Sequence, residues 1–153
     1  MNVICRKANK EDIDDLYTLI QSYAEKGIML PRSKELLEEQ LADFVVAEIG
    51  GQIVGCGSLC QLGSDLLEIR SLGVQEEFKG RGIGKKLVAE LEQEARKKKI
   101  MKIMALTYEV EFFERNGYSV VAKEIFPEKV WKDCMYCSKQ NCCDEIAVLK
   151  RLD

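Results

Sequence analysis

Apolar residues recur along the chain with two different spacings, one typical of helices and one typical of strands. In the N-terminal part, apolar residues three or four positions apart predict a helix over residues 12–26, which Asn9 can cap, and a second helix that begins after Ser33. The same spacing predicts helices over residues 84–98 and 110–116. Short apolar runs predict strands at residues 3–6, 44–49, 53–59, 66–74, 100–107, 118–125 and 145–150.

The order of these elements indicates a single α+β domain over residues 1–153. Gly50-Gly51 permits the positive dihedral angles of a tight hairpin between the second and third strands. A strand, a helix and a strand between residues 66 and 107 form one βαβ unit. The pattern contains no internal repeat and no linker, and the cysteine-rich residues 134–143 connect the last two strands.

The composition is that of a globular protein and narrows the choice of partners. Hydrophobic residues make up 46% of the 153 residues and charged residues 32%, so the chain can bury a core. A formal net charge of −3 argues against nucleic acid or an anionic membrane as the main partner. No apolar run approaches the roughly 20 residues that a membrane span needs, and the N-terminus lacks a signal-peptide pattern. We therefore expect a cytoplasmic protein.

The strongest chemical signal is a glycine-rich, basic loop between the strand that ends at Val74 and the helix that follows. The loop reads Lys79-Gly-Arg-Gly-Ile-Gly84. A helix start presents backbone N–H groups without internal partners and carries about half a positive charge. Glycines at positions 80, 82 and 84 let a diphosphate approach these groups, and the neighbouring Lys and Arg side chains add cationic donors. The loop therefore predicts a phosphate-binding site.

Other interpretations of this loop fit the sequence less well. A dinucleotide-binding fingerprint needs an acidic residue about 20 positions further on, and residues 99–102 contain none. A Walker loop needs Gly-Lys-Ser/Thr, whereas Gly84 is followed by Lys85-Lys86. A glycine-rich turn without a ligand would not need the strand before it, the helix after it and the basic residues around it.

In this setting, the loop resembles the signature of the GNAT acetyltransferase superfamily, Gln/Arg-x-x-Gly-x-Gly/Ala. Lys79 is a conservative departure at the first position, and Phe112-Phe-Glu-Arg-Asn-Gly-Tyr118 looks like the family's Phe-Tyr-Glu-Lys-x-Gly-Phe segment. The resemblance runs over essentially the whole chain. It implies a GNAT fold, with a central mixed, mostly antiparallel, twisted sheet of six to seven strands flanked by about four helices.

The same resemblance implies that acetyl-CoA is the cosubstrate. Its pantetheine arm is then expected between the strands at residues 68–74 and 102–107, bonded by backbone groups of the first strand. The residues expected to bind the coenzyme are Leu72, Gly73, Val74, Lys79, Gly80, Arg81, Gly82, Ile83, Gly84 and Lys85.

A closer likeness concerns the acceptor. Five segments resemble the acetyltransferase domain of N-acetylglutamate synthases, and more specifically the short bacterial form without an amino-acid-kinase domain. These enzymes acetylate the α-amine of glutamate in arginine biosynthesis, so the likeness implies a small-molecule amino-acid acceptor. The segments are Gly27-Ile-Met-Leu-Pro-Arg-Ser33, Val54-Gly-Cys-Gly-Ser-Leu59, Leu67-Glu-Ile-Arg-Ser-Leu-Gly-Val74, Ala105-Leu-Thr107 and Phe126-Pro-Glu-Lys-Val-Trp131.

Acid–base chemistry must work without imidazole, because the chain has no histidine. Glu68 is our first choice of base for the acceptor ammonium, directly or through a water, although it could instead only pair with Arg70 or lie at the rim of the cleft. The usual GNAT acid is the tyrosine of Phe-Tyr-Glu-Lys, but Phe113 stands there and cannot donate a proton. Thr107 and Tyr108 are the substitutes, and a free coenzyme thiolate is also a tolerable leaving group.

Three cations are candidates for binding the carboxylates of an anionic acceptor: Arg32, Arg70 and Lys129. Each could instead be a solvated surface cation. Other amino acids, a polyamine or a protein N-terminus remain alternative acceptors. A non-catalytic acyl-CoA sensor or subunit is the alternative from a different class, which Phe113 favours. A homodimer is left open.

The remaining motif is a cysteine cluster, Cys134-Met-Tyr-Cys137 followed by Cys142-Cys143. These thiolates could hold a structural zinc, with the CxxC as one knuckle. The alternatives are a thiol-rich connection without metal and a redox motif. The odd total of seven cysteines argues against a disulfide framework.

Overall fold

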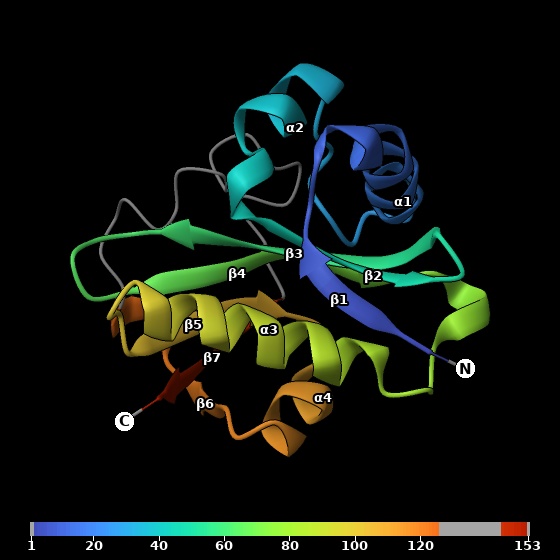
Figure 1. The fold of residues 1–153 in the computed structure, drawn as a ribbon. Coiled ribbons are helices and arrows are strands. Elements are labelled where there is room, and N and C mark those ends of the chain that lie inside the picture. Colours follow the sequence, from blue (N-terminus) through green and yellow to red (C-terminus); the bar gives the residue numbers. More distant parts are fainter. Residues whose placement is uncertain (1, 126–144, 153) are drawn as a thin grey trace. The chain divides into compact units, whose positions relative to one another are not determined.

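The computed structural model describes residues 2–125 and 145–152, which form an α+β arrangement (Figure 1). The described strands are β1 (Ile4–Lys7), β2 (Phe44–Ile49), β3 (Gln52–Gln61), β4 (Leu67–Val74), β5 (Lys102–Thr107), β6 (Ser119–Val121) and β7 (Ile146–Arg151). The described α-helices are α1 (Ile13–Glu25), α2 (Lys34–Glu39), α3 (Ile83–Lys97) and α4 (Val110–Arg115). Within these residues, no helix combines the length and the apolar character needed to cross a bilayer.

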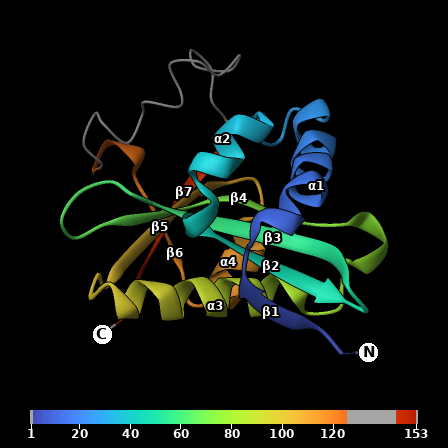
Figure 2. The same ribbon diagram turned by 45° about the horizontal axis from the view of Figure 1, so that its top comes forward.

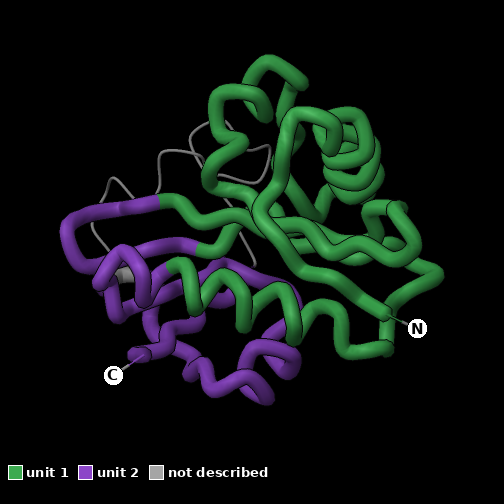
Figure 3. Tube along the Cα trace, viewed as in Figure 1, with its two compact units in different colours: residues 1–60, 69–94 green, residues 61–68, 95–153 purple. Residues whose placement is uncertain are grey.

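The described residues fall into two compact units, and β4 contributes to both (Figure 3). Unit 1 comprises Met1–Cys60 and Ile69–Glu94, and unit 2 comprises Gln61–Glu68 and Ala95–Asp153. The strands follow the hydrogen-bonded order β1-β2-β3-β4-β5-β7-β6. β4 and β5 pair in parallel, and the other described ladders are antiparallel. The predicted α+β class, with a mixed and mostly antiparallel sheet, is confirmed, whereas the single domain stays a prediction.

In unit 1, the predicted hairpin joins β2 to β3. Gly50 and Gly51 have φ angles of 57° and 84°, as the hairpin requires. The helices α1 and α2 lie on one face of these strands (Figure 2), because their apolar residues and those of β2 share a core. The fully buried members of this core are Leu16, Ile20, Leu37, Val46 and Cys56.

The helix α3 covers the other face of β3 in unit 1 (Figure 2). Two glycines allow its close approach. A Cβ added at Gly55 would lie 3.0 Å from Leu87 Cδ1, and one added at Gly57 would lie 3.0 Å from Leu91 Cδ1. A side chain at either position would therefore push the helix away from the strand.

Both predicted helix caps of the N-terminal region are present. The Asn9 side chain accepts a hydrogen bond from the Glu11 N–H, and the Asp12 carboxylate accepts one from the Asn9 N–H at 2.8 Å, which forms a capping box. This box caps a 3-10 turn (Lys10–Asp12) that leads directly into α1. The Ser33 hydroxyl caps α2 by accepting a hydrogen bond from the Leu36 N–H at 3.1 Å.

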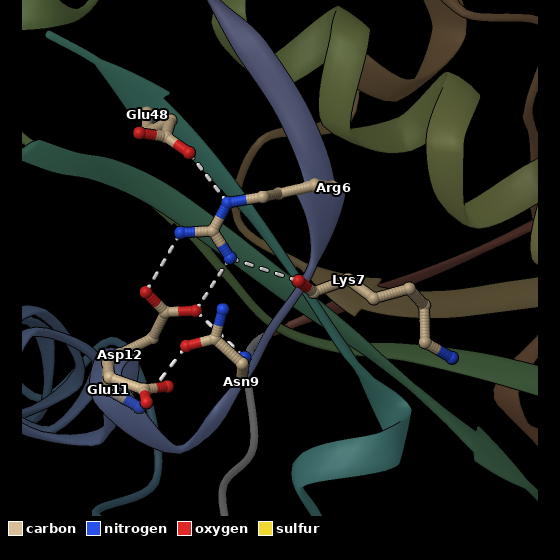
Figure 4. A network of polar contacts seen from close by, with 6 residues as sticks. All are labelled: Arg6, Lys7, Asn9, Glu11, Asp12 and Glu48. Carbon is tan, nitrogen blue, oxygen red and sulfur yellow. Dashed lines mark hydrogen bonds and ion pairs between the residues drawn. The ribbon is translucent and has the colours of Figure 1, made fainter. Parts of the chain in front are cut away.

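Arg6 of β1 joins this capping box to the sheet (Figure 4). Its Nη1 and Nη2 donate to Asp12 Oδ2 at 2.7 Å and Asp12 Oδ1 at 2.9 Å. Its Nε donates to Glu48 of β2 at 2.6 Å. One guanidinium therefore binds two carboxylates from different elements.

Unit 2 pairs β5 with β7 and β7 with β6. One boundary of β5 and one of β6 differ from the prediction by more than one residue. The strand expected at 118–125 ends at Val121 and is followed by a 3-10 turn (Lys123–Ile125). The strand expected from residue 100 begins at Lys102, because Lys99 takes a φ of 59° and Ile100 N–H bonds back to the Ala95 carbonyl at 3.1 Å.

Candidate active site

The glycine-rich loop lies between β4 and α3 in unit 1, as predicted. Gly80 and Gly82 have φ angles of 79° and 80°, which favour glycine, and α3 begins at Ile83. The Lys86 N–H donates to the Gly82 carbonyl at 3.2 Å, so the N–H groups of residues 83–85 belong to the first turn, where a helix has no internal partners for them. A Cβ at Gly80 or Gly82 would meet nothing within 4 Å. The loop thus fits a phosphate group held by backbone amides.

The cationic side chains of the loop already have contacts within unit 1. Lys79 Nζ lies 3.1 Å from Glu76 Oε2 and 5.2 Å from the centroid of the Tyr23 ring. Partial burial lowers the pKa of Lys79, but the hydrogen bond to Glu76 and the contact with Tyr23 outweigh it and raise the pKa overall. Arg81 lies over the Phe78 ring at 5.4 Å. Lys79 would therefore bring a positive charge to a phosphate.

The C-terminal half of β4 carries a contact that the sequence did not reveal. The Val74 N–H donates to Tyr23 Oη at 3.0 Å, and the Tyr23 hydroxyl donates to the Val74 carbonyl at 2.7 Å. In the sequence, Tyr23 is only one of the apolar residues whose spacing predicts the helix over residues 12–26. The only signal was its type, because a buried tyrosine usually finds a partner for its hydroxyl.

Arg32, one of the predicted acceptor-binding cations, has its guanidinium oriented by two side-chain hydrogen bonds. Its Nε donates to Ser71 Oγ at 2.9 Å, and its Nη1 donates to Gln40 Oε1 at 2.9 Å. Ser71 is on β4 and adopts a φ of 53°, in the left-handed region. These bonds hold a half-buried guanidinium beside β4. Sequence reasoning found Arg32 but missed Ser71 and Gln40, which the chain places 39 and 8 residues away.

Arg70 is half-buried on the same strand, directly before Ser71. Its carbonyl accepts a hydrogen bond from Ser58 Oγ at 3.0 Å, which fixes the backbone at this point of β4. A role of its side chain in acceptor binding stays a prediction.

The predicted acid–base residues belong to unit 2. Glu68 is buried, with 6% of its surface exposed, and pairs in register with Met104 of β5. Thr107, at the end of β5, is buried as well, and its Oγ1 accepts a hydrogen bond from the Glu109 N–H at 2.7 Å. The proton of this hydroxyl is thus not used in that bond. Tyr108 is 38% exposed.

Phe113 fills the position at which the resembling family carries its tyrosine acid. Its ring is buried and stands edge-on to Phe112 and Tyr118, with centroid distances of 5.2 and 5.1 Å. In this chain, the position belongs to an aromatic cluster of unit 2.

Several predicted residues lie outside the described residues: Lys129, Cys134, Cys137, Cys142 and Cys143. Within the described ranges 2–125 and 145–152, no group of three or more His, Cys, Asp or Glu side chains could hold a metal ion. The zinc prediction concerns residues beyond these ranges and stays a prediction.

Comparisons with known proteins identify the family of the chain. The profile of the Acetyltransferase (GNAT) family matches residues 11–118. An uncharacterized N-acetyltransferase of Chlorobaculum tepidum is 42% identical over 147 residues, which cover 96% of this chain and 95% of the relative. An amino-acid acetyltransferase of Mycobacterium tuberculosis is 38% identical over 82% of this chain and 76% of the relative.

A solved structure adds ligands to the comparison. The N-acetylglutamate synthase from Neisseria gonorrhoeae, complexed with coenzyme A and N-acetyl-glutamate, superimposes with a TM-score of 0.89 at 30% identity. The match covers 100% of this chain but only 36% of that chain, so our chain spans about a third of the Neisseria enzyme. Together, the loop, the sheet and these relatives show that the chain belongs to the GNAT acetyltransferase family, among its amino-acid acetyltransferases.

Proposed function

We propose that this protein transfers the acetyl group of acetyl-CoA to the α-amine of L-glutamate, a reaction of arginine biosynthesis, in the cytoplasm. Arg32 supports the anionic acceptor most directly. Its guanidinium is oriented by Ser71 and Gln40 beside the strand that is expected to line the coenzyme site. A fixed guanidinium binds a carboxylate with both charge and geometry. The Neisseria relative, solved with coenzyme A and N-acetyl-glutamate, supports the same acceptor.

The coenzyme would be held by the loop and by the end of β4. The N–H groups of residues 83–85, opened by Gly80 and Gly82, fit its diphosphate. Lys79, Arg81 and Lys85 supply charge, and backbone groups of Leu72, Gly73 and Val74 fit the amides of the pantetheine arm. Bound there, acetyl-CoA supplies an activated acyl thioester.

Glu68 and Thr107 take the proton-transfer roles in this proposal. The acceptor ammonium gives one proton to Glu68, directly or through a water, and its nitrogen then forms a bond to the thioester carbon. As the carbon–sulfur bond breaks, the nitrogen gives its second proton to water, which leaves a neutral amide. The leaving sulfur receives a proton from solvent or from a hydroxyl. Thr107 suits this role, because its Oγ1 accepts from Glu109 and keeps its own proton for donation. Tyr108 is the second choice.

A panel of acceptors tests the proposal. Purified protein is incubated with acetyl-CoA and L-glutamate, L-glutamine, L-aspartate, spermidine or a short peptide with a free N-terminus, and the acetylated product is measured by mass spectrometry. We expect the highest kcat/KM with glutamate. Robust acetylation of another amine without acetylation of glutamate would reject the acceptor. Coenzyme binding without turnover on any amine would favour the sensor.

Variants of Arg32 separate recognition from folding. In Arg32→Met, we expect the KM for glutamate to rise at least about tenfold, since the variant removes a charge-assisted contact, with an unchanged Kd for acetyl-CoA. Arg115→Met is the matched control. Arg115 is 70% exposed, and its ion pair with the exposed Glu111 is long, at 4.0 Å between Nη1 and Oε2. Equal kinetics of Arg32→Met and the control would remove Arg32 from the acceptor site.

Two further parts of the proposal have separate tests. Metal analysis of the purified protein shows whether the cysteines of residues 134–143 hold zinc, and light scattering shows whether the chain forms a homodimer. The proposed zinc is structural, and the proposed reaction does not depend on it.

A further inference from the structure

The Tyr23 hydroxyl makes two hydrogen bonds to the main chain of one residue, Val74. It accepts from the N–H at 3.0 Å and donates to the carbonyl at 2.7 Å. Both groups belong to the last residue of β4, which precedes the glycine-rich loop by a short 3-10 turn. They are main-chain groups of the kind that an amide of the pantetheine arm would use, and Tyr23 uses them here.

Packing holds the Tyr23 ring at this position. Gly73 leaves the space for it, because a Cβ added there would lie 3.0 Å from Tyr23 Cζ and 3.4 Å from Met29 Cε. Two ammonium groups lie over the ring, Lys79 Nζ at 5.2 Å and Lys26 Nζ at 6.0 Å from its centroid. Lys79 is itself a residue of the loop. Tyr23 thus contacts both regions of unit 1 that are proposed to bind the coenzyme.

We propose that Tyr23 is a further residue of the coenzyme site, whose hydroxyl occupies the Val74 main-chain groups until an amide of the pantetheine arm displaces it. The inference rests on the proposed function. A main-chain N–H has one proton, so the Val74 N–H cannot fully serve Tyr23 Oη and a pantetheine carbonyl together. Binding of the arm through this N–H therefore costs the protein the hydrogen bond from the Val74 N–H to the hydroxyl, and Tyr23 lowers the affinity for any carrier with this arm.

Removal of the Tyr23 hydroxyl oxygen is therefore expected to tighten the binding of coenzyme A. In Tyr23→Phe the ring keeps its packing, but the Val74 groups lose their partner in the free protein. The Kd for coenzyme A is expected to fall about 3- to 10-fold, which corresponds to the net value of one hydrogen bond. Adenosine 3′,5′-bisphosphate lacks the pantetheine arm, so its Kd is expected to stay the same. Titration calorimetry measures both.

A second tyrosine of α1 provides the matched control. Tyr17 is half-buried and contacts Lys34 through its ring, at 5.4 Å from the Lys34 Nζ. Tyr17→Phe removes the same atom and is expected to leave both dissociation constants at the wild-type values. Circular dichroism melts of the two variants show that each is folded at the titration temperature.

The outcomes separate this inference from the proposed function. An unchanged or weaker affinity of Tyr23→Phe for coenzyme A would overturn the inference alone, as would an equal gain for the bisphosphate. If wild-type protein bound neither ligand at millimolar concentration, the proposed coenzyme site would fail and the inference with it. A gain limited to coenzyme A and to Tyr23→Phe would support it.

Discussion

The ion-pair network of Arg6 offers the most direct test of the fold, because it needs no ligand (Figure 4). The perturbation is Asp12→Ala. It removes two charge-assisted bonds, from Arg6 Nη1 at 2.7 Å and from Arg6 Nη2 at 2.9 Å. It also removes the acceptor for the Asn9 N–H of the capping box. Three contacts of one carboxylate are therefore lost together.

The magnitude follows from burial. The Asp12 side chain is 7% exposed and the Arg6 side chain 30%, so the pair lies between a surface pair and a buried one. Hydrogen bonds to charged groups contribute about 1.5–3 kcal/mol, and loss of a helix cap costs about 1 kcal/mol. Arg6 keeps Glu48 as a partner, which limits the loss. We expect the free energy of unfolding to fall by about 3 kcal/mol and Tm by about 6–12 °C for a chain of this length.

The same network makes the free energy of unfolding depend on pH. Burial raises the pKa of Asp12, but its hydrogen bonds with Arg6 and the Asn9 N–H outweigh it and hold the pKa below its ordinary value. The unfolded chain therefore binds more protons in acid than the folded chain. The contribution of Asp12 to the free energy of unfolding is fully present above the unfolded pKa of about 4, and it is lost as the pH falls through the lower folded pKa. The difference in the free energy of unfolding between wild type and Asp12→Ala should therefore become smaller in acid.

The assay is urea and thermal unfolding followed by circular dichroism at pH 7, 4 and 3. Asp14→Ala, in the first turn of α1, is the control, because Asp14 is 84% exposed and pairs with Lys34 at 3.0 Å on the surface. We expect the control to change stability by less than about 0.5 kcal/mol. A loss in Asp12→Ala no larger than that of the control, or a loss that is the same at pH 7 and pH 3, would refute the reasoning.

Three further predictions concern single residues. Gly82→Asp should raise the Kd for coenzyme A more than about tenfold, because it places a carboxylate at the phosphate site and a side chain at a φ of 80°, and an unchanged Kd in calorimetry would argue against the loop. Glu68→Gln should lower kcat more than about tenfold while the Kd for acetyl-CoA stays constant, and wild-type turnover would dismiss Glu68 as the base. Cys56 should resist alkylation at pH 8 in the folded protein, because burial raises the pKa of its thiol to about 12. Peptide mapping against the urea-unfolded chain measures this, and modification of the native protein at the rate of the unfolded chain would contradict it.

Local signals of the sequence predicted most of the fold. The caps at Asn9 and Ser33 and the hairpin at Gly50-Gly51 depend on residues within a few positions of one another, and the structure confirms all three. The turn between α3 and β5 was not predicted, because the residue that forms it gives no local signal. Lys99 takes the left-handed conformation that usually marks a glycine, so its residue type gave no sign of the turn before β5.

The candidate site could be predicted only where a motif carries it. The loop glycines were found because their spacing reflects a backbone requirement. The partners of Arg32 and Val74 were not found, because each contact joins residues that only the tertiary fold brings together. Tyr23 and Val74 are 51 positions apart, and Arg32 and Ser71 are 39 apart. Hydrophobic spacing indicates the face of α1 on which Tyr23 packs, partly buried, against the core, but it cannot show where the polar end of such a side chain points.

Phe113 gives a final test of how far a family motif determines the chemistry of this chain. Its ring is 3% exposed and packs edge-on between Phe112 and Tyr118, so a hydroxyl added by Phe113→Tyr would enter an apolar cluster. An unpaired buried hydroxyl costs about 1–3 kcal/mol. We expect a lower Tm and no gain in kcat, whereas Phe112→Tyr, at a half-buried position, should change little. A higher kcat at an unchanged Tm would show that position 113 faces the leaving sulfur, and Thr107 would then lose its role as the proposed proton donor.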